Sequence, residues 1–205
     1  MNIFQRTTPE ALKIALVGLR PMSSLIEKEL ALATGAIKRE TVNWVPMWVD
    51  WGNAVRSDET SATAVRAISD RFEPLWYVRH DTKRHGFHST RTLPLEAIEE
   101  ARRAWDHRRV VRSEWDEVLR VRRELLLGRR KLRVTQQDAF DSALCTIGIQ
   151  WFLRRTGIGL VPSISGRSAA LLMRIEPQLG FVIHQALQRE ARARGEVPEP
   201  ALQTA

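Results

Sequence analysis

Residues 61–72 read Ser61-Ala-Thr-Ala-Val-Arg-Ala-Ile-Ser-Asp-Arg-Phe72, and this stretch decides which fold the sequence favours. Val65, Ile68 and Phe72 repeat at helical spacing, and Pro74 follows soon afterwards as a helix stop. The spacing predicts a short amphipathic helix with its apolar side inward. The opposite side of that helix would carry polar residues, namely Ser61, Thr63, Arg66 and Asp70.

A β-hairpin is expected directly after this helix. Residues 75–79 are rich in strand-forming side chains, and residues 87–93 hold a second candidate strand. The segment 80–86 between them is polar and basic and ends in a glycine, which suits a turn. The hairpin would therefore have a charged tip.

Helices are also expected before this stretch. The apolar spacing over residues 9–35 predicts two short helices divided by Pro21. Trp44, Trp48 and Trp51 follow at positions i, i+4 and i+7, which places three indoles on one face of a further helix. A core stripe is the favoured interpretation, with base stacking or a partner groove as the alternatives.

The second half of the chain is predicted to be helical. An apolar stripe favours one long helix over residues 94–127, which needs a partner to bury its face. Thr135 can cap the next helix, which would end at Gly157. A last helix would begin within residues 163–168, with Pro177 bending or dividing it.

This order of elements resembles a winged helix-turn-helix DNA-binding domain. The closer likeness is to MarR-type regulators: residues 61–72 look like their recognition helix, residues 75–93 like their wing, and Thr92-Leu-Pro-Leu-Glu-Ala-Ile-Glu-Glu-Ala like the entry into their linker helix. The likeness extends over about two fifths of the chain. Glu73-Pro74 stands where such proteins commonly have a glycine, so the approach to the first strand is expected to differ.

The resemblance implies a mainly α fold, with a winged helix-turn-helix domain that contains a small β-hairpin and a helical C-terminal region after it. The implied division has three parts, a DNA-binding domain over 1–93, a helical oligomerisation and linker region over 94–195, and a disordered tail over 196–205.

Two groups of DNA contacts follow from this interpretation. The recognition helix would present Ser61, Thr63, Arg66 and Asp70 to the major groove, where Arg66 can donate two hydrogen bonds to a guanine edge. The wing would reach phosphates or an adjacent minor groove with Arg79, Lys83, Arg84 and His85. An ordinary solvated hairpin is the alternative for the second group.

The charge of the chain favours a polyanionic partner. Its 205 residues include 32 lysine and arginine against 24 aspartate and glutamate, a net charge of +8. Most of this excess lies in residues 101–133, where we expect phosphate contacts from Arg102, Arg103, Arg108 and Arg109. The alternative for this segment is a solvated helix with intrahelical ion pairs such as Asp116 to Arg120.

Several other functions have no support in the sequence. The single cysteine, Cys145, cannot form an internal disulfide, and no apolar run is long enough to cross a bilayer, so a cytoplasmic protein without a membrane contact is expected. His80, His85 and His88 match no metal-binding spacing. We find no catalytic motif, and therefore predict neither an enzyme nor a cofactor or metal site.

The favoured function is a sequence-specific protein that binds double-stranded DNA, a homodimeric transcription regulator whose helices after Pro94 pair two copies. One alternative is an arginine-rich helical subunit of a nucleoprotein assembly that binds RNA or single-stranded nucleic acid. A winged-helix protein of replication or of a mobile element is another.

Overall fold

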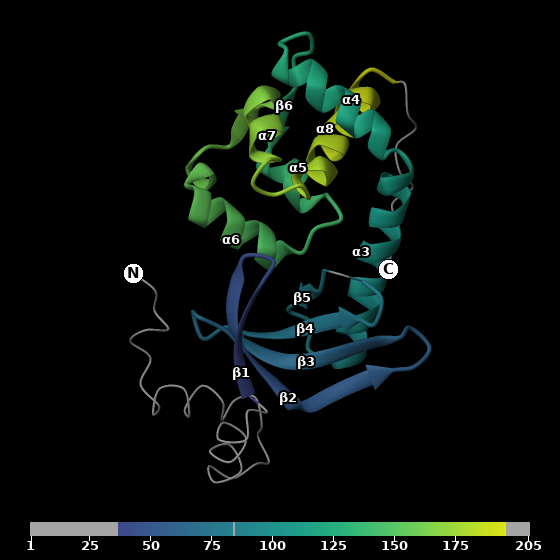
Figure 1. Ribbon diagram of the computed structural model, residues 1–205, viewed down its shortest axis with the longest axis vertical. Coiled ribbons are helices and arrows are strands. Elements are labelled where there is room, and N and C mark those ends of the chain that lie inside the picture. The colour runs from purple at the N-terminus through teal and green to yellow at the C-terminus, as the bar shows by residue number, and fades with distance from the viewer. Residues whose placement is uncertain (1–36, 84, 196–205) are drawn as a thin grey trace. The chain divides into compact units, whose positions relative to one another are not determined.

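The computed structural model describes residues 37–83 and 85–195 (Figure 1). The helices expected over 9–35, the wing residue Arg84 and the tail over 196–205 lie outside this range. The described residues form two compact units, each defined by the contacts within it. Unit 1 contains residues 37–103 and 145–151, and unit 2 contains residues 104–144 and 152–195.

Unit 1 is built on a five-stranded antiparallel sheet in which each strand pairs with the next along the chain. The first half of helix α3 lies behind these strands (Figure 1), and Ser89 Oγ donates a hydrogen bond to Glu100 Oε2 of that helix at 2.5 Å. The strands are β1 (Ile37–Val42), β2 (Val45–Ser57), β3 (Ala62–Ser69), β4 (Pro74–His80) and β5 (Phe87–Ser89).

The prediction of a mainly α, winged helix-turn-helix fold is therefore wrong. A winged helix places its helices before a small hairpin, whereas here a complete sheet precedes the helices of the described chain. The expected hairpin is present as β4 and β5, with Tyr77 opposite His88. It forms the end of the larger sheet.

The stretch expected to be the recognition helix is strand β3. Val65 and Ala67 lie on the face with the main apolar cluster of unit 1, while Ile68 has the register of the opposite face. Both faces are covered, and Ala62, Ala64, Val65, Ala67 and Ile68 are all buried. A strand covered on both faces needs no alternation, so its apolar residues can fall at helical spacing by coincidence.

The expected tryptophan helix is also absent. Asn43 and Trp44 have positive φ values of 46° and 73° and connect Val42 to Val45, a two-residue hairpin turn of the type that matches strand twist. Trp48 and Trp51 lie in β2. The i, i+4, i+7 spacing therefore places the indoles on a turn and a strand instead of on one helical face.

One substitution separates the helix and strand interpretations of residues 61–72. Phe72 has a φ of +63° and is 41% exposed, so the backbone strain that Phe72→Gly relieves offsets part of the buried area that it removes. We expect urea denaturation to give a free energy of unfolding within about 1 kcal/mol of the wild type. A core phenylalanine on a helix would instead cost about 3 to 5 kcal/mol.

The sheet face that carries Val65 and Ala67 holds the main apolar cluster of unit 1. Ile147, from the first turn of helix α6, packs against this cluster. The buried members of the cluster are Met47, Val49, Val65, Ala67, Leu75 and Tyr77. Residues 145–151 thus complete a core that otherwise comes from the first half of the chain.

The predicted long helix over 94–127 is divided at Glu114, whose carbonyl accepts hydrogen bonds from the N–H groups of Glu117 and Val118. Ser113 Oγ donates to the carbonyl of Val110 at 2.6 Å, a back-bond that tends to bend helices. The two helices are α3 (Pro94–Ser113) and α4 (Trp115–Leu126).

The start and stop signals of the later helices are confirmed, but the single helix expected from Thr135 to Gly157 is wrong, because the chain turns after Phe140 and forms two helices, α5 and α6. Thr135 and Asp138 form a capping box at the start of α5, Gly157 follows α6 with a φ of 73°, and Ser165 caps α7. Pro177 lies between α7 and α8. The remaining elements are β6 (Arg133–Thr135), α5 (Gln136–Phe140), α6 (Thr146–Thr156), the 3₁₀ turn η2 (Ile158–Leu160), β7 (Ser163–Ser165), α7 (Gly166–Leu172) and α8 (Leu179–Ala193).

Candidate nucleic-acid interface

Three polar side chains lie next to one another across the sheet of unit 1. Thr63 of β3 pairs directly with Arg56 of β2 on one side and with Arg79 of β4 on the other. Neighbouring strands are about 4.8 Å apart, so the row spans about 10 Å from Arg56 to Arg79. We call these three residues the polar row.

Trp51 holds one end of the polar row in place. The guanidinium carbon of Arg79 lies 5.6 Å from the centre of the Trp51 ring, which is a cation–π contact. Trp51 Nε1 donates a hydrogen bond to Glu40 Oε1 at 3.0 Å, and the ring stands edge-on to Tyr77. Arg79 is therefore oriented although its side chain is exposed.

An irregularity in β2 brings Trp51 to this position. The register between β2 and β3 shifts between Asp50 and Ala54, as in a β-bulge. The buried Asp50 accepts hydrogen bonds from the Gly52 N–H and from Asn53 Nδ2, both at 3.2 Å. These bonds fix the bulged segment that carries the indole.

The two arginines of the polar row differ in how their charge is used. Arg56 donates two hydrogen bonds to Asp81 and one to Asp58. These bonds raise the pKa of Arg56 above its ordinary value and lower that of Asp81. Arg79 makes no ion pair with any residue in 37–83 or 85–195, so its charge is the one that a ligand can use.

Tyr77 packs against Trp51 next to the polar row and carries no charge. It is 5% exposed, and burial raises the pKa of its hydroxyl, an effect that the nearby Arg79 partly opposes. The Tyr77 hydroxyl therefore stays protonated at physiological pH, and its ring gives Trp51 an apolar packing surface.

The remaining residues of the two predicted DNA-contact groups are dispersed. Arg66 lies on the opposite face, 5.1 Å from the ring centre of Trp76. Ser61 is in the turn before β3, and Asp70 is buried after β3, where its N–H donates to the carbonyl of Pro46. Lys83 lies in the exposed turn between β4 and β5, and His85 in the same turn is half-buried.

The arginines expected to contact phosphates are held by neighbouring groups. Arg102 and Arg103 both bind Glu99, and Arg109 binds Asp106. Arg108 is buried, and its Nε donates to the carbonyl of Ala143 at 2.8 Å. Intrahelical pairs of the kind that the alternative interpretation expected are therefore present, each contributing about 0.3 to 0.5 kcal/mol. The partners of Arg120 are Glu117 and Glu124 instead of the expected Asp116.

The three histidines considered for a metal site are separated by their contacts. His80 Nδ1 accepts a hydrogen bond from the Thr82 N–H, whereas the buried His88 lies 3.3 Å from Cys145 Sγ and stacks on Tyr77. Within the described ranges, no group of three histidine, cysteine or acidic side chains is arranged to hold a metal ion.

The sequence pattern did not identify Trp51, Glu40 or Arg56 as parts of this site. Trp51 was placed on a helix, and a bulge that turns one side chain toward a neighbouring strand has no clear sequence signal.

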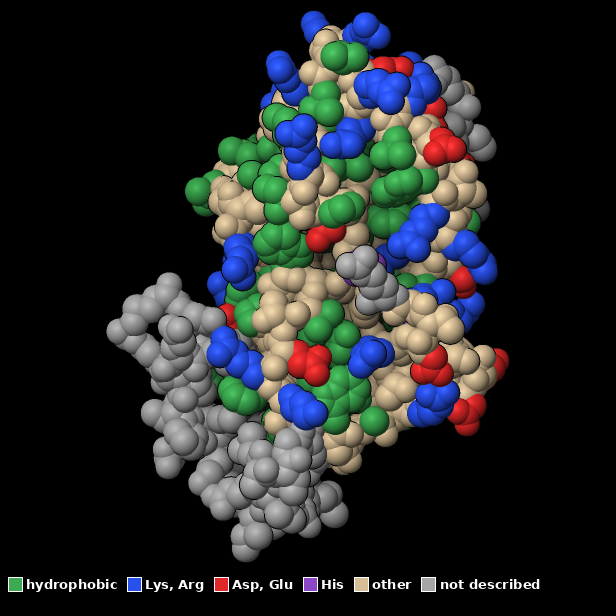
Figure 2. Space-filling model, viewed as in Figure 1, with side chains coloured by type: hydrophobic (Ala, Val, Ile, Leu, Met, Phe, Trp, Pro, Cys, Tyr) green, Lys and Arg blue, Asp and Glu red, His purple; other side chains and the backbone are tan. Residues whose placement is uncertain are grey.

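Figure 2 shows basic, acidic and apolar side chains side by side over the lower part of the view, where Figure 1 shows the strands. The sheet therefore carries individual cations and no continuous basic patch on this face.

Comparisons with models of protein families, with curated proteins and with solved structures find no match. Among the helices of the described residues, none is both long enough and apolar enough to cross a membrane.

Proposed function

We propose that this protein binds double-stranded DNA in a sequence-specific manner through the polar row and Trp51. The observation that carries the proposal is the pairing of Thr63 with an exposed Arg79 that Trp51 orients. Arginine on a rigid support can donate two hydrogen bonds to a guanine edge, and threonine can contact either kind of base pair.

The dimensions of the polar row suit a major groove. The row spans about 10 Å, and the major groove of B-form DNA is about 12 Å wide. Strands are used by several DNA-binding proteins to read a groove directly. The net charge of +8 would attract the polyanion before specific contacts form.

The contacts of Trp51 favour duplex DNA over a single strand. A protein that stacks single-stranded bases needs a free aromatic face. Arg79 covers one face of the Trp51 ring, and the Glu40 bond fixes the ring's orientation. The indole is therefore better suited to holding Arg79 than to receiving a base.

Pairing of two copies on a palindromic site stays a prediction.

Replacing Arg79 tests this function. A duplex is first selected from a random pool with the full chain, and its affinity is compared with that of a scrambled duplex. We expect Arg79→Ala to reduce the difference between them by about 1 to 3 kcal/mol, because a bidentate base contact is lost. Arg79→Lys should lose much of the same discrimination, since lysine keeps the charge without the planar fork.

Arg102→Ala is the matched control, because it also removes one exposed cation of unit 1 but lies on α3 beside Glu99. It should leave the discrimination unchanged. The proposal fails if no sequence is enriched, or if Arg79→Ala weakens both duplexes equally. Equal affinity for duplex DNA, single-stranded DNA and RNA would instead favour the nucleoprotein-assembly alternative.

A further inference from the structure

Unit 2 contains a short two-stranded ribbon that brings two distant basic segments together. Strand β6 pairs with β7, with Arg133 opposite Ser165 and Thr135 opposite Ser163. The Gly166 N–H donates to the carbonyl of Leu132 at 2.8 Å, which continues the same register by one residue. Beyond this bond the chain enters helix α7, and Arg167 lies in its first turn.

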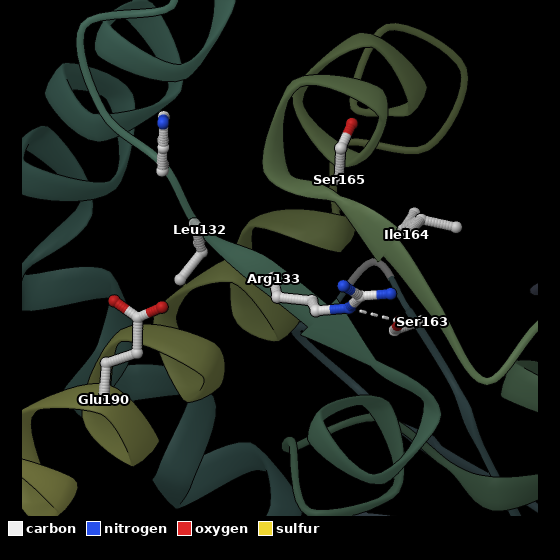
Figure 3. A pocket seen from close by; sticks show the side chains of 7 residues that line it. Leu132, Arg133, Ser163, Ile164, Ser165 and Glu190 are labelled. Carbon is white, nitrogen blue, oxygen red and sulfur yellow. Dashed lines mark hydrogen bonds between the residues drawn. The ribbon is translucent and has the colours of Figure 1, made fainter.

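The ribbon borders an open hollow of about 440 Å³ (Figure 3). A small anion therefore has room beside these side chains. The walls of the hollow combine cationic, hydroxyl and apolar groups with one carboxylate, and the lining residues are Lys131, Leu132, Arg133, Ser163, Ile164, Ser165 and Glu190.

Arg133 is held so that part of its guanidinium remains available. Its Nε donates a hydrogen bond to Ser163 Oγ at 2.7 Å, and Figure 3 shows the side chain extended along the ribbon toward that serine. Its two terminal nitrogens have no hydrogen-bond partner in the described part of the chain. Such a fork matches two oxygens of a phosphate group.

Two further charges lie near Arg133: Lys131 lines the same hollow, and Arg167 follows the ribbon in the first turn of α7. Both side chains are exposed, and neither makes an ion pair with a residue in the described ranges. This distinguishes them from Arg102 and Arg103 of α3, whose charges are used by Glu99. Three cations lie at one end of the ribbon without carboxylates bound to them.

Glu190 is the carboxylate that opposes anion binding in the hollow. It has a cation of its own, because Arg194 Nη1 lies 3.8 Å from its Oε2 one helical turn further on. Figure 2 agrees with a positive balance, since basic side chains gather over the upper end of the view, where Figure 1 shows α4 and β6. Lys131 and Arg133 thus face one carboxylate that Arg194 already approaches, which leaves a net attraction for an anion.

We infer that the ribbon site, defined as Lys131, Arg133, Arg167 and the hydroxyl of Ser163, binds a phosphate group. The ligand is a phosphate ester, either a phosphodiester of a nucleic acid backbone or a small phosphate compound. Lysine and arginine supply charge, the guanidinium fork supplies geometry, and the Ser163 hydroxyl can donate to a remaining oxygen. The site is distinct from the polar row, and its nucleic-acid form rests on the function proposed above.

The test uses the full chain carrying Lys131→Ala with Arg167→Ala. The first readout is calorimetric titration with pyrophosphate, and the second is the salt dependence of binding to a duplex. We expect pyrophosphate binding to weaken by about tenfold or more, because two charge-assisted contacts are lost. If the duplex backbone occupies the site, the slope of log affinity against log salt falls by about 1.8.

The matched control is Arg123→Ala with Arg174→Ala, which removes the same charge from two other exposed positions of unit 2. It should leave pyrophosphate binding within about twofold of the wild type. Arg167→Glu, tested by itself, should weaken pyrophosphate more than Arg167→Ala does, because it places a like charge opposite the ligand. Thermal melts confirm that each variant is folded.

Each result has a distinct meaning. Loss of pyrophosphate binding with a lower salt slope supports a nucleic acid backbone, and the same loss with an unchanged slope supports a small phosphate compound. A wild-type chain that binds pyrophosphate but no duplex would overturn the proposed DNA function and leave the ribbon site standing. The ribbon site is overturned if the variant and its control bind pyrophosphate equally, or if the wild type does not bind it at millimolar concentration.

Discussion

Asp138→Ala is expected to lower the free energy of unfolding of unit 2 by about 3 kcal/mol. Asp138 is 2% exposed, and its carboxylate accepts hydrogen bonds from the N–H and hydroxyl of Thr135 and from two nitrogens of Arg189. Loss of the cap costs about 1 kcal/mol, and loss of the charged hydrogen bonds contributes about 2 kcal/mol more.

Urea denaturation followed by circular dichroism measures this effect. Asp141→Ala is the control, because Asp141 lies at the other end of the same short helix, is exposed and receives a hydrogen bond from Gln137. It should change stability by less than about 0.5 kcal/mol. Equal effects of the two substitutions would show that Asp138 does not join α5, β6 and α8 as described.

Leu125→Ala is expected to destabilise unit 2 by about 2 to 5 kcal/mol. Leu125 is 1% exposed on α4, which packs against α7 and α8. A methyl group added to Gly166 would come within 2.7 Å of Leu125 Cδ2, so the leucine side chain leaves no space between α4 and Gly166. Truncation leaves a cavity that a close-packed core closes poorly.

Leu119→Ala is the matched control, since Leu119 lies on the same helix but is 42% exposed. It should cost less than about 1 kcal/mol in dilute protein. Urea titrations of both variants under identical conditions give the comparison. A cost for Leu119 as large as that for Leu125 would mean that the outer face of α4 is covered in solution.

Local signals in the sequence predicted several helix ends in the second half of the chain, although they missed the ribbon of β6 and β7 and the division between α5 and α6. A cap at Thr135, a left-handed glycine at 157 and a proline at 177 each depend on the backbone of a few adjacent residues. Such features need no knowledge of distant contacts. The break at Glu114 was missed because it accompanies a serine back-bond, which a stripe of apolar residues does not reveal.

The fold of the first half was predicted wrongly because the apolar residues of 61–72 fit both a helix and a strand buried on both faces. Val65 and Ile68 fit a helix by spacing, yet they occupy opposite faces of a strand that is covered on both sides. Once β3 is a strand, Thr63 and Arg79 become neighbours while Arg66 moves to the other face. Two residues of the candidate site were therefore named from the sequence, but their pairing depends on register that the sequence pattern did not specify.

The placement of residues 145–151 has a consequence for biosynthesis. Unit 1 completes its apolar cluster with Ile147, which is separated from Arg103 by more than forty residues of unit 2. At translation speeds of about 5 to 20 residues per second, roughly 2 to 9 s pass on the ribosome between the synthesis of Arg103 and that of Ile147. During that interval the nascent sheet exposes part of its apolar face, so a pause or truncation between these points is expected to leave a chain that depends on chaperones.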